Sequence, residues 1–236
     1  MQIVIPAAGA GSRFKEYTQV PKPYIDVNGK PMIVSAVESL DIRGVYTYIL
    51  PKHDLTESVK KQLLELTPVA IFIEIDYITE GAVETAMLAQ KHLISDKELI
   101  IVNCDQIMNW DSADALEKLR GSDASVITIE DYSTKHSYVE VQDNRIVRFN
   151  EKETVTGIAL TGIHYWKQAE LFTQSAQQMI VENNRTKNEF YVSTTYNYLL
   201  SQNVSVSYVN IPATQIQFVG IPTDLEAYLN DSKKNG

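Results

Sequence analysis

The stretch IVIPAAGAGSRF, residues 3–14, indicates the fold class of this 236-residue chain. A run of β-branched residues ends at Pro6 and passes into small residues, a pattern typical of a buried strand that feeds a glycine loop. Small residues let backbone amides approach an anion closely, so residues 8–11 form a candidate phosphate-binding loop. Taken alone, the loop is equally consistent with a tight turn after a strand.

Strands and helices alternate over the first 130 residues. The pattern predicts apolar strands at 45–50, 69–75, 99–102 and 124–129, and helices at 31–40, 55–66, 82–93 and 112–119. Short apolar strands without a polar face are typical of a parallel sheet that is covered on both sides. We therefore expect an α/β fold with a mixed, mainly parallel sheet and helices on both faces.

The pattern changes after residue 130. It predicts consecutive strands at 138–141, 146–149 and 158–165, followed by helices at 167–182 and 189–201, a strand at 204–209 and a last helix at 223–230. Asp143-Asn144 is typical of a hairpin turn between two of these strands. No internal repeat or linker divides the chain, so we expect one domain over residues 1–236 with a β-rich part in its C-terminal half.

Composition narrows the classes of partner. The chain has 21 Lys and Arg against 30 Asp and Glu, a net charge of −9, which disfavours nonspecific nucleic-acid binding. No apolar run is long enough to span a membrane. The single cysteine, Cys104, cannot form an internal disulfide, as expected in a reducing compartment. We expect a cytoplasmic protein without nucleic-acid or membrane partners, and the sequence does not indicate its oligomeric state.

The first 31 residues depart from this acidic balance. They carry a net charge of +2, from Arg13, Lys15, Lys22 and Lys30 against Glu16 and Asp26. A cationic segment beside a glycine loop suits a polyanion such as a nucleoside triphosphate. A dinucleotide-binding loop would need glycine where Phe14 stands, and a P-loop would need a Gly-Lys-Ser/Thr triplet that the chain lacks.

Several motifs, taken in order, resemble those of the sugar-nucleotidyltransferase family, the nucleotide-diphospho-sugar pyrophosphorylases. They are residues 9–14, Pro21-Lys22-Pro23, residues 29–33, Asn103-Cys104-Asp105, Glu151-Lys152, Glu189-Phe190-Tyr191 and residues 220–225. The resemblance implies a Rossmann-like nucleotidyltransferase domain over nearly the whole chain. It also implies a nucleotide-binding half at 1–130 and an acceptor-binding half at 131–230.

The resemblance assigns roles to individual positions. It implies that the nucleotide is bound by Ala8, Gly9, Ala10, Gly11, Arg13 and Gly81. Arg13, Lys22 and Asp105 would be the catalytic residues, with Asp105 holding magnesium (Mg2+). Glu151, Lys152 and Glu189 would bind the acceptor. Asp224 would be either a second metal ligand or a cap of the last helix.

Three departures from the family pattern bear on these roles. His136-Ser137 stands where relatives have a glycine after a tyrosine, and no proline follows Lys152. Residues 217–222 contain no carboxylate, although relatives have a second metal ligand near that motif. Elsewhere, we expect His164 to be structural, Cys104 to be a buried small residue, and Asp111 to cap the helix that begins near Ser112.

The implied reaction joins a sugar 1-phosphate to the α-phosphate of a nucleoside triphosphate and releases pyrophosphate, for surface-polysaccharide precursors. The monoester is largely a dianion at pH 7, since its second pKa is about 6, so the reaction needs no general base. Charge neutralisation and in-line positioning suffice, and Mg2+, Lys and Arg supply them. Two alternatives stay open: a cytidylyltransferase acting on a non-sugar phosphate, and an inactive nucleotide-binding regulator of the same fold.

Overall fold

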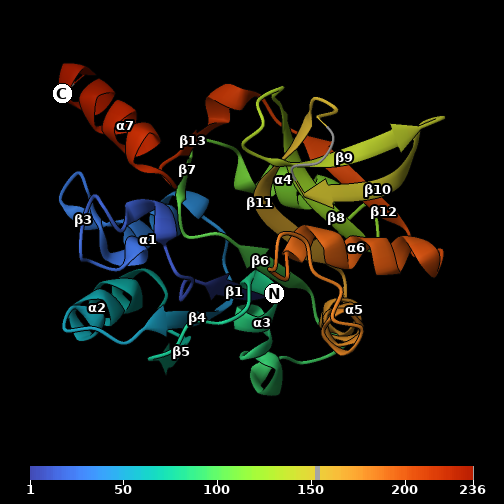
Figure 1. Ribbon diagram of the computed structural model, residues 1–236, viewed down its shortest axis with the longest axis horizontal. Coiled ribbons are helices and arrows are strands. Elements are labelled where there is room, and N and C mark those ends of the chain that lie inside the picture. The colour runs from blue at the N-terminus through green and yellow to red at the C-terminus, as the bar shows by residue number, and fades with distance from the viewer. Residues whose placement is uncertain (152–154, 236) are drawn as a thin grey trace.

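A nine-stranded mixed sheet forms the centre of the computed structural model, which describes residues 1–151 and 155–235 (Figure 1). Its N-terminal half is parallel, in the order β5-β4-β1-β6. These strands span Gln2–Pro6 (β1), Val45–Pro51 (β4), Ala70–Ile75 (β5) and Leu99–Val102 (β6). Because this order carries the chain outward from β1 in both directions, the loops after β1 and β6 lie side by side.

The C-terminal half of the sheet is largely antiparallel. The long strand β11 pairs with β6, β8 and β9, while β10 pairs with β9 and β12 runs parallel to β8. These strands span Ala124–Glu130 (β8), Ser137–Gln142 (β9), Arg145–Glu151 (β10), Ile158–Trp166 (β11) and Val206–Asn210 (β12). Asp143 and Asn144 both have positive φ, as a two-residue hairpin requires, so the predicted turn is confirmed.

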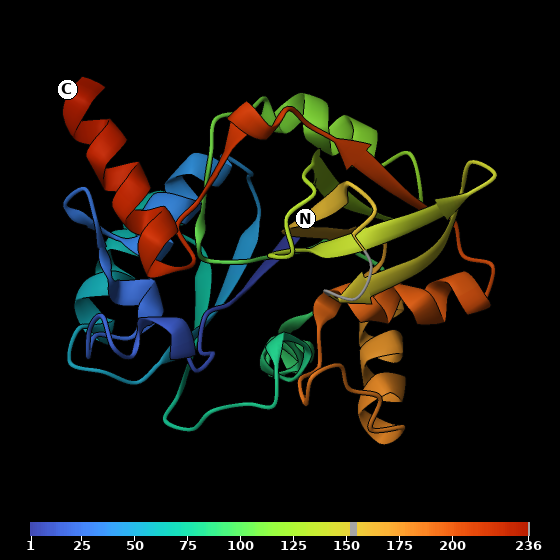
Figure 2. The same ribbon diagram turned by 45° about the horizontal axis from the view of Figure 1, so that its top comes forward.

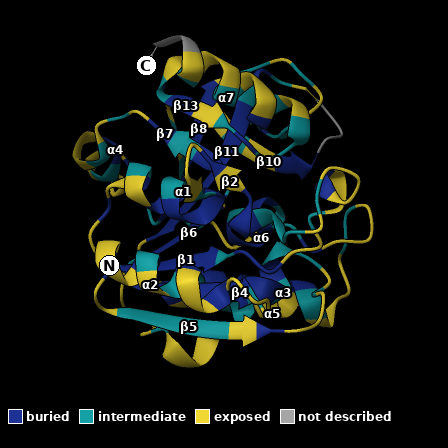
Figure 3. Cartoon of the chain, turned by 90° about the vertical axis from the view of Figure 1, so that its left-hand side faces the viewer, coloured by how far each residue is buried: buried dark blue, intermediate teal, exposed yellow. Residues whose placement is uncertain are grey.

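Helices cover both faces of the sheet, as the sequence predicts. One face carries Met32–Leu40 (α1), Thr56–Leu66 (α2) and Ser112–Leu119 (α4), and the other carries Ala82–Met87 (α3), Ala169–Val181 (α5) and Val192–Ser201 (α6). In β1, Ile3 and Ile5 pack into the first layer and Val4 into the second. Figure 3 shows the buried residues concentrated in the central strands.

A third, smaller core lies at one end of the molecule. It joins Phe14 of the first loop to Leu225 of the last helix, α7 (Pro222–Asn235). Figures 1 and 2 show α7 beside the N-terminal loops and far from the β9–β10 hairpin. The first and the last of the sequence motifs, residues 9–14 and 220–225, therefore lie close together in space.

Four short strands were not predicted. Gln106–Met108 (β7) pairs with Ile216–Phe218 (β13), and Asp26–Val27 (β2) pairs with Lys30–Pro31 (β3). Strands of two or three residues are too short to show a period of two in the sequence. The β7–β13 pair matters for the site, because it holds residues 216–218 next to the residues that follow β6.

Two predicted helices are shorter than expected. The helix predicted at 82–93 ends at Met87 and continues as a 3-10 turn over Gln90–His92. The helix predicted at 189–201 begins only at Val192, because the backbone of Phe190 forms hydrogen bonds with Glu80 and with Val83 at the start of α3. In the described part of the chain, no helix is long and apolar enough to cross a membrane.

Candidate functional site

A cavity of about 1040 Å³ opens between the carboxyl ends of β1 and β6 and the antiparallel half of the sheet. Ligands of open α/β sheets bind outside the carboxyl ends of such strands. The lining residues include Arg13, Asp105, Glu151, Ser193 and Asp224. With Tyr191, residues from five of the sequence motifs thus meet in one space, although they are up to about 210 positions apart in the chain.

An ion pair between Lys22 and Asp105 lies at the strand ends, with the lysine Nζ donating to Oδ2 of the carboxylate. Burial lowers the pKa of Lys22, but the charge of Asp105, its hydrogen bond and the neighbouring Cys104 together outweigh burial and leave that pKa raised. Lys22 is therefore charged at neutral pH. Gly11 has a φ of 55°, and a Cβ there would lie 3.1 Å from Cβ of Lys22, so the glycine loop packs directly on this lysine.

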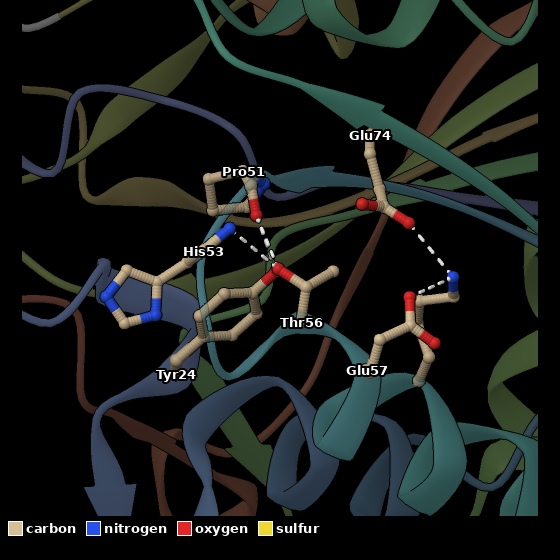
Figure 4. Close-up of polar contacts among 7 residues, drawn as sticks. Tyr24, Pro51, His53, Thr56, Glu57 and Glu74 are labelled. Carbon is tan, nitrogen blue, oxygen red and sulfur yellow. Dashed lines mark hydrogen bonds and ion pairs between the residues drawn. The ribbon is translucent and has the colours of Figure 1, made fainter.

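Tyr24 anchors the short 3-10 helix Lys22–Tyr24 to the end of β4 (Figure 4). Its hydroxyl donates to the carbonyl oxygen of Pro51 at 2.8 Å and lies 3.2 Å from Oγ1 of Thr56. Thr56 in turn donates to the same carbonyl at 3.1 Å. Burial raises the pKa of Tyr24 to about 12, so the hydroxyl keeps its proton at neutral pH. This anchor fixes the backbone that carries Lys22.

Asp105 is enclosed on its other side by Gly220. A Cβ at Gly220 would lie 2.3 Å from Oδ2 of Asp105, so a larger residue would displace the carboxylate. The backbone amide of Val219 donates to the carbonyl of Asp105 at 2.9 Å. Phe218 occupies the carboxylate-free stretch, with its ring 4.9 Å from that of His136. Within residues 1–151 and 155–235, no three His, Cys, Asp or Glu side chains cluster to hold a metal.

Asp224 lies in the first turn of α7 and lines the same cavity. Its Oδ1 accepts a hydrogen bond from Nζ of Lys135 at 3.0 Å. The helix begins at Pro222, so Asp224 is inside the first turn rather than at the capping position. The structure thus pairs Asp224 with a lysine at the rim.

Gly81 lies between the two halves of the site. Its φ is 140°, and a Cβ there would lie 2.5 Å from the backbone nitrogen of Phe190. Arg185 holds this junction: its guanidinium lies 4.2 Å from the ring centroid of Phe190 and 2.5 Å from Oε2 of Glu80. The loop proposed for the nucleotide and the loop that carries Glu189 are therefore packed against each other.

Glu151 is the buried carboxylate of the site, with 2% of its surface exposed. It accepts hydrogen bonds from the hydroxyls of Ser137 and Ser193, the latter at 3.3 Å. Ser137 is the residue that replaces the family's glycine, so this departure adds a hydrogen bond to Glu151. Lys152 lies among residues 152–154, outside the described residues.

Glu189 is exposed at the edge of the site and borders Tyr191, which lines the cavity. Burial raises the pKa of Tyr191, and the charges of Glu189 and Glu151 raise it further. The two carboxylates are therefore close enough to the Tyr191 hydroxyl to act on its ionisation.

The first glycine loop differs along its length. Ala8 is buried, whereas Gly9 and Ala10 are exposed beyond the end of β1.

One buried polar residue beside Asp105, Gln106, was missed by the sequence analysis. Both polar side-chain atoms of Gln106 are buried without a hydrogen-bond partner, and so is Nδ1 of His164. Gly162, at φ 86°, lies against Asn103 and Gln106: a Cβ there would be 2.2 Å from Nδ2 of Asn103 and 3.2 Å from Oε1 of Gln106. Gln106 follows Asp105 directly in the chain, but nothing in the sequence indicates that its amide is buried.

Several structural expectations are confirmed. The Asp111 carboxylate caps α4, accepting from the amides of Ala113 and Asp114 at 3.0 Å each. Cys104 is buried, and burial raises the pKa of its thiol to about 12, so it is not a thiolate. His164 is buried and stacks on Trp166, but it also lines the cavity and its Nδ1 has no hydrogen-bond partner among the described residues.

Residues 3–153, more than half of the chain, match the family described as the MobA-like NTP transferase domain. The chain belongs to this family. Among curated relatives it is 30% identical to a mannose-1-phosphate guanyltransferase of Aspergillus oryzae over 163 residues, which is 64% of the chain and 45% of that protein. It is 29% identical to mannose-1-phosphate guanyltransferase beta-B of Xenopus laevis, covering 66% of the chain and 46% of that protein. The chain thus spans about half the length of these relatives.

Solved structures share this fold over nearly the whole chain. A nucleoside-diphosphate-sugar pyrophosphorylase from Vibrio cholerae superposes with a TM-score of 0.84 at 18% identity, covering 97% of this chain and 99% of that one. The inositol-1-phosphate CTP transferase from T. maritima superposes with a TM-score of 0.73 at 17% identity, covering 100% and 96%. The predicted family and fold class are therefore confirmed.

Proposed function

We propose that this NTP transferase domain joins a sugar 1-phosphate to the α-phosphate of a nucleoside triphosphate and releases pyrophosphate. The observation that carries the proposal is the Lys22–Asp105 pair, which packs on Gly11 at the strand ends and whose Asp105 lines one cavity together with Arg13. That cavity also contains Glu151, held by two hydroxyls. The relatives named as mannose-1-phosphate guanyltransferases support this kind of substrate.

In this reaction an oxygen of the acceptor phosphate bonds to the α-phosphorus, and the bond from that phosphorus to the pyrophosphate oxygen breaks. No proton has to move, because the monoester is a dianion above its second pKa of about 6. The chain therefore needs to align the two phosphates and to offset their charge. Arg13 and Lys22 provide positive charge, and residues 8–11 provide backbone amides.

The acceptor side would position the sugar. Glu151 accepts hydrogen bonds and suits sugar hydroxyls, and the exposed carboxylate of Glu189 suits hydroxyls at the entrance. Lys152 is proposed for the acceptor's phosphate, as the family resemblance implies. Because Gly81 has no side chain, the loop proposed for the nucleotide packs directly on the backbone of Phe190, next to the loop proposed for the acceptor. This packing would bring the two substrates together.

A magnesium ion fits the donor set of this site. Magnesium commonly binds through one or two protein carboxylates, with phosphate and water oxygens completing its shell. Asp105 is such a carboxylate, and its enclosure by Lys22 and Gly220 fixes its orientation. When bound, the ion would offset negative charge on the triphosphate. Asp224 is kept as a second-ligand proposal, since it lines the same cavity.

The test is release of pyrophosphate from five nucleoside triphosphates, each paired with a set of sugar 1-phosphates. We expect one pairing to exceed the others by at least about tenfold in kcat/KM. Phosphocholine and inositol 1-phosphate belong in the set, because the inositol-1-phosphate CTP transferase shares this fold. A preference for either would favour the cytidylyltransferase alternative. Nucleotide binding without turnover of any pairing would favour an inactive regulator.

The product of the proposed reaction is an activated sugar donor. We place this step in the synthesis of surface-polysaccharide precursors in the cytoplasm, where nucleoside triphosphates are available and a lone cysteine such as Cys104 stays reduced.

A further inference from the structure

The inner end of the cavity contains a histidine that the proposed reaction does not use. His164 is on β11, two residues beyond Gly162, and both residues line the cavity. Only 5% of its surface is exposed, and that part faces the cavity. The amide of Asn103 and Oε1 of Gln106 occupy the space beside Gly162, so the polar groups of Asn103, Gln106 and His164 gather at this end of the cavity. A ligand in the cavity therefore lies next to the imidazole.

His164 has hydrogen-bonding capacity that the protein leaves unused. Its Nδ1 is buried and has no hydrogen-bond partner. A buried polar atom without a partner is costly, and a ligand or water that supplies the partner recovers that cost. Burial lowers the pKa of His164 to about 3, so the ring is neutral at physiological pH. A neutral imidazole donates one hydrogen bond and accepts another, as a hydroxyl does.

The surrounding groups indicate which chemistry this end accepts. Glu151, Ser137 and Ser193 line the same cavity, and the two serines already donate to the carboxylate. Trp166 stacks on His164 and the tilted ring of Tyr196 packs against it, but both are 0% exposed, so they offer a ligand no free aromatic face. A quaternary ammonium group prefers open aromatic faces, whereas a hydroxyl is suited to hydroxyls and a neutral imidazole.

We infer that His164 determines acceptor specificity by hydrogen-bonding an uncharged hydroxyl of the acceptor at the inner end of the cavity. The inference rests on the proposed function and deepens it, since it names a residue that selects among sugar phosphates. A site built to hydrogen-bond a hydroxyl rejects the analogue that lacks it, because its own polar atoms are then left without partners.

The experiment compares the preferred sugar 1-phosphate with its monodeoxy analogues. His164→Phe keeps the aromatic stack and removes both ring nitrogens. Tyr196→Phe is the matched control, because it alters the same aromatic cluster at a hydroxyl that bonds Ser125 and does not line the cavity. kcat/KM for the acceptor is measured at saturating triphosphate, together with KM for the triphosphate.

We expect the wild type to lose about tenfold or more in kcat/KM for one deoxy analogue. His164→Phe should lower kcat/KM for the parent by a similar factor and no longer distinguish it from that analogue, with KM for the triphosphate changed less than twofold. Tyr196→Phe should keep the wild-type ratio. The inference is overturned if His164→Phe retains that ratio for every analogue, or if Tyr196→Phe loses it too.

A binding measurement separates this inference from the proposed function. If the wild type releases no pyrophosphate with any pairing, the proposed function fails. The thermal shift caused by millimolar sugar 1-phosphate alone then tests His164: a shift lost in His164→Phe and kept in Tyr196→Phe supports it, and equal shifts or none overturn it. If His164→Phe does not fold, His164→Gln replaces it, and unchanged selectivity in that variant overturns the inference.

Discussion

The two ends of the cavity are built in different ways. The end proposed for the phosphates, the phosphate end, comes from loops that follow parallel strands. Its main side chains are charged and partly exposed: Arg13 and Asp105 line the cavity, and Lys22 is paired with Asp105. The acceptor end comes from antiparallel strands and the start of α6, and its polar residues Glu151 and His164 are buried. In the proposed reaction, the first end would offset charge on any triphosphate, whereas the second would discriminate between neutral groups.

The largest effect on activity is expected from a substitution in the phosphate end. Asp105→Asn keeps the shape of the side chain but removes the charge that orients Lys22. We expect kcat to fall by at least about tenfold, the scale of losing a charged hydrogen bond, with little loss of stability. Pyrophosphate release over a magnesium titration measures the effect. Asp111→Asn, which alters only the cap of α4, should keep full activity. Wild-type turnover in Asp105→Asn would remove this carboxylate from the reaction.

The junction between the two ends gives the next largest effect. Gly81→Ala places a Cβ 2.5 Å from the backbone of Phe190 at a φ of 140°. We expect the free energy of unfolding to fall by about 2–3 kcal/mol, since neither the strain nor the clash can be relieved by one side chain. KM should rise for both substrates.

Urea denaturation gives the stability change for this variant. Gly9→Ala is the matched comparison, because nothing lies within 4 Å of the added Cβ. We expect it to cost less than about 1 kcal/mol in the free energy of unfolding. Equal stabilities for the two variants would contradict the close contact between the two loops.

How far the sequence predicts each end follows from how each is built. The phosphate end lies in contiguous motifs, so residues 9–14, Lys22 and Asp105 could be identified without a structure, and the alternation of strands and helices predicts the sheet that unites them. The acceptor end depends on a bulge in β11 between Leu160 and His164 and on its pairing with β8. No local pattern shows that the buried His164 lines the cavity.

The same contrast explains the residues that were missed. Gln106 is in a three-residue strand, β7, whose partner β13 comes more than 100 positions later. Such pairing has no periodic signal, and burial of the amide follows only from the tertiary structure. Gly220 is similar: its sequence motif was recognised, but its contact with the Asp105 carboxylate depends on that pairing.

A pH experiment sharpens the contrast at the acceptor end. Burial lowers the pKa of His164 to about 3, whereas in the unfolded chain it is near 6.5. As the pH falls below 6.5, His164 takes up a proton in the unfolded state but not in the folded state, so the free energy of unfolding falls. Between pH 7 and pH 5 this residue should cost about 2 kcal/mol in the free energy of unfolding.

His164→Phe cannot take up that proton, so its stability should fall by about 2 kcal/mol less over the same interval. Urea denaturation of both proteins at pH 7 and pH 5 gives the difference. Tyr196→Phe, which retains His164, should follow the wild type. Parallel pH profiles for wild type and His164→Phe would mean that the folded protein does protonate this ring.

The smallest expected effect concerns the anchor behind the phosphate end. Tyr24→Phe removes the hydroxyl that bonds Pro51 and Thr56, while the Pro51 carbonyl still accepts from Thr56. The loss should therefore be about 1 kcal/mol of stability. Because this anchor fixes the turn that carries Lys22, kcat should also fall a few-fold, with KM for the acceptor unchanged.

Tyr46→Phe provides the comparison for this last effect. The Tyr46 hydroxyl is also buried and donates to a backbone carbonyl, that of Ile42 at 2.6 Å, but it has no contact with the Lys22 turn. We expect a similar loss of stability without a change in kcat. If both variants lower kcat equally, the effect of Tyr24 is a general consequence of destabilisation. If only Tyr24→Phe does so, the phosphate end depends on this anchor as well as on its charges.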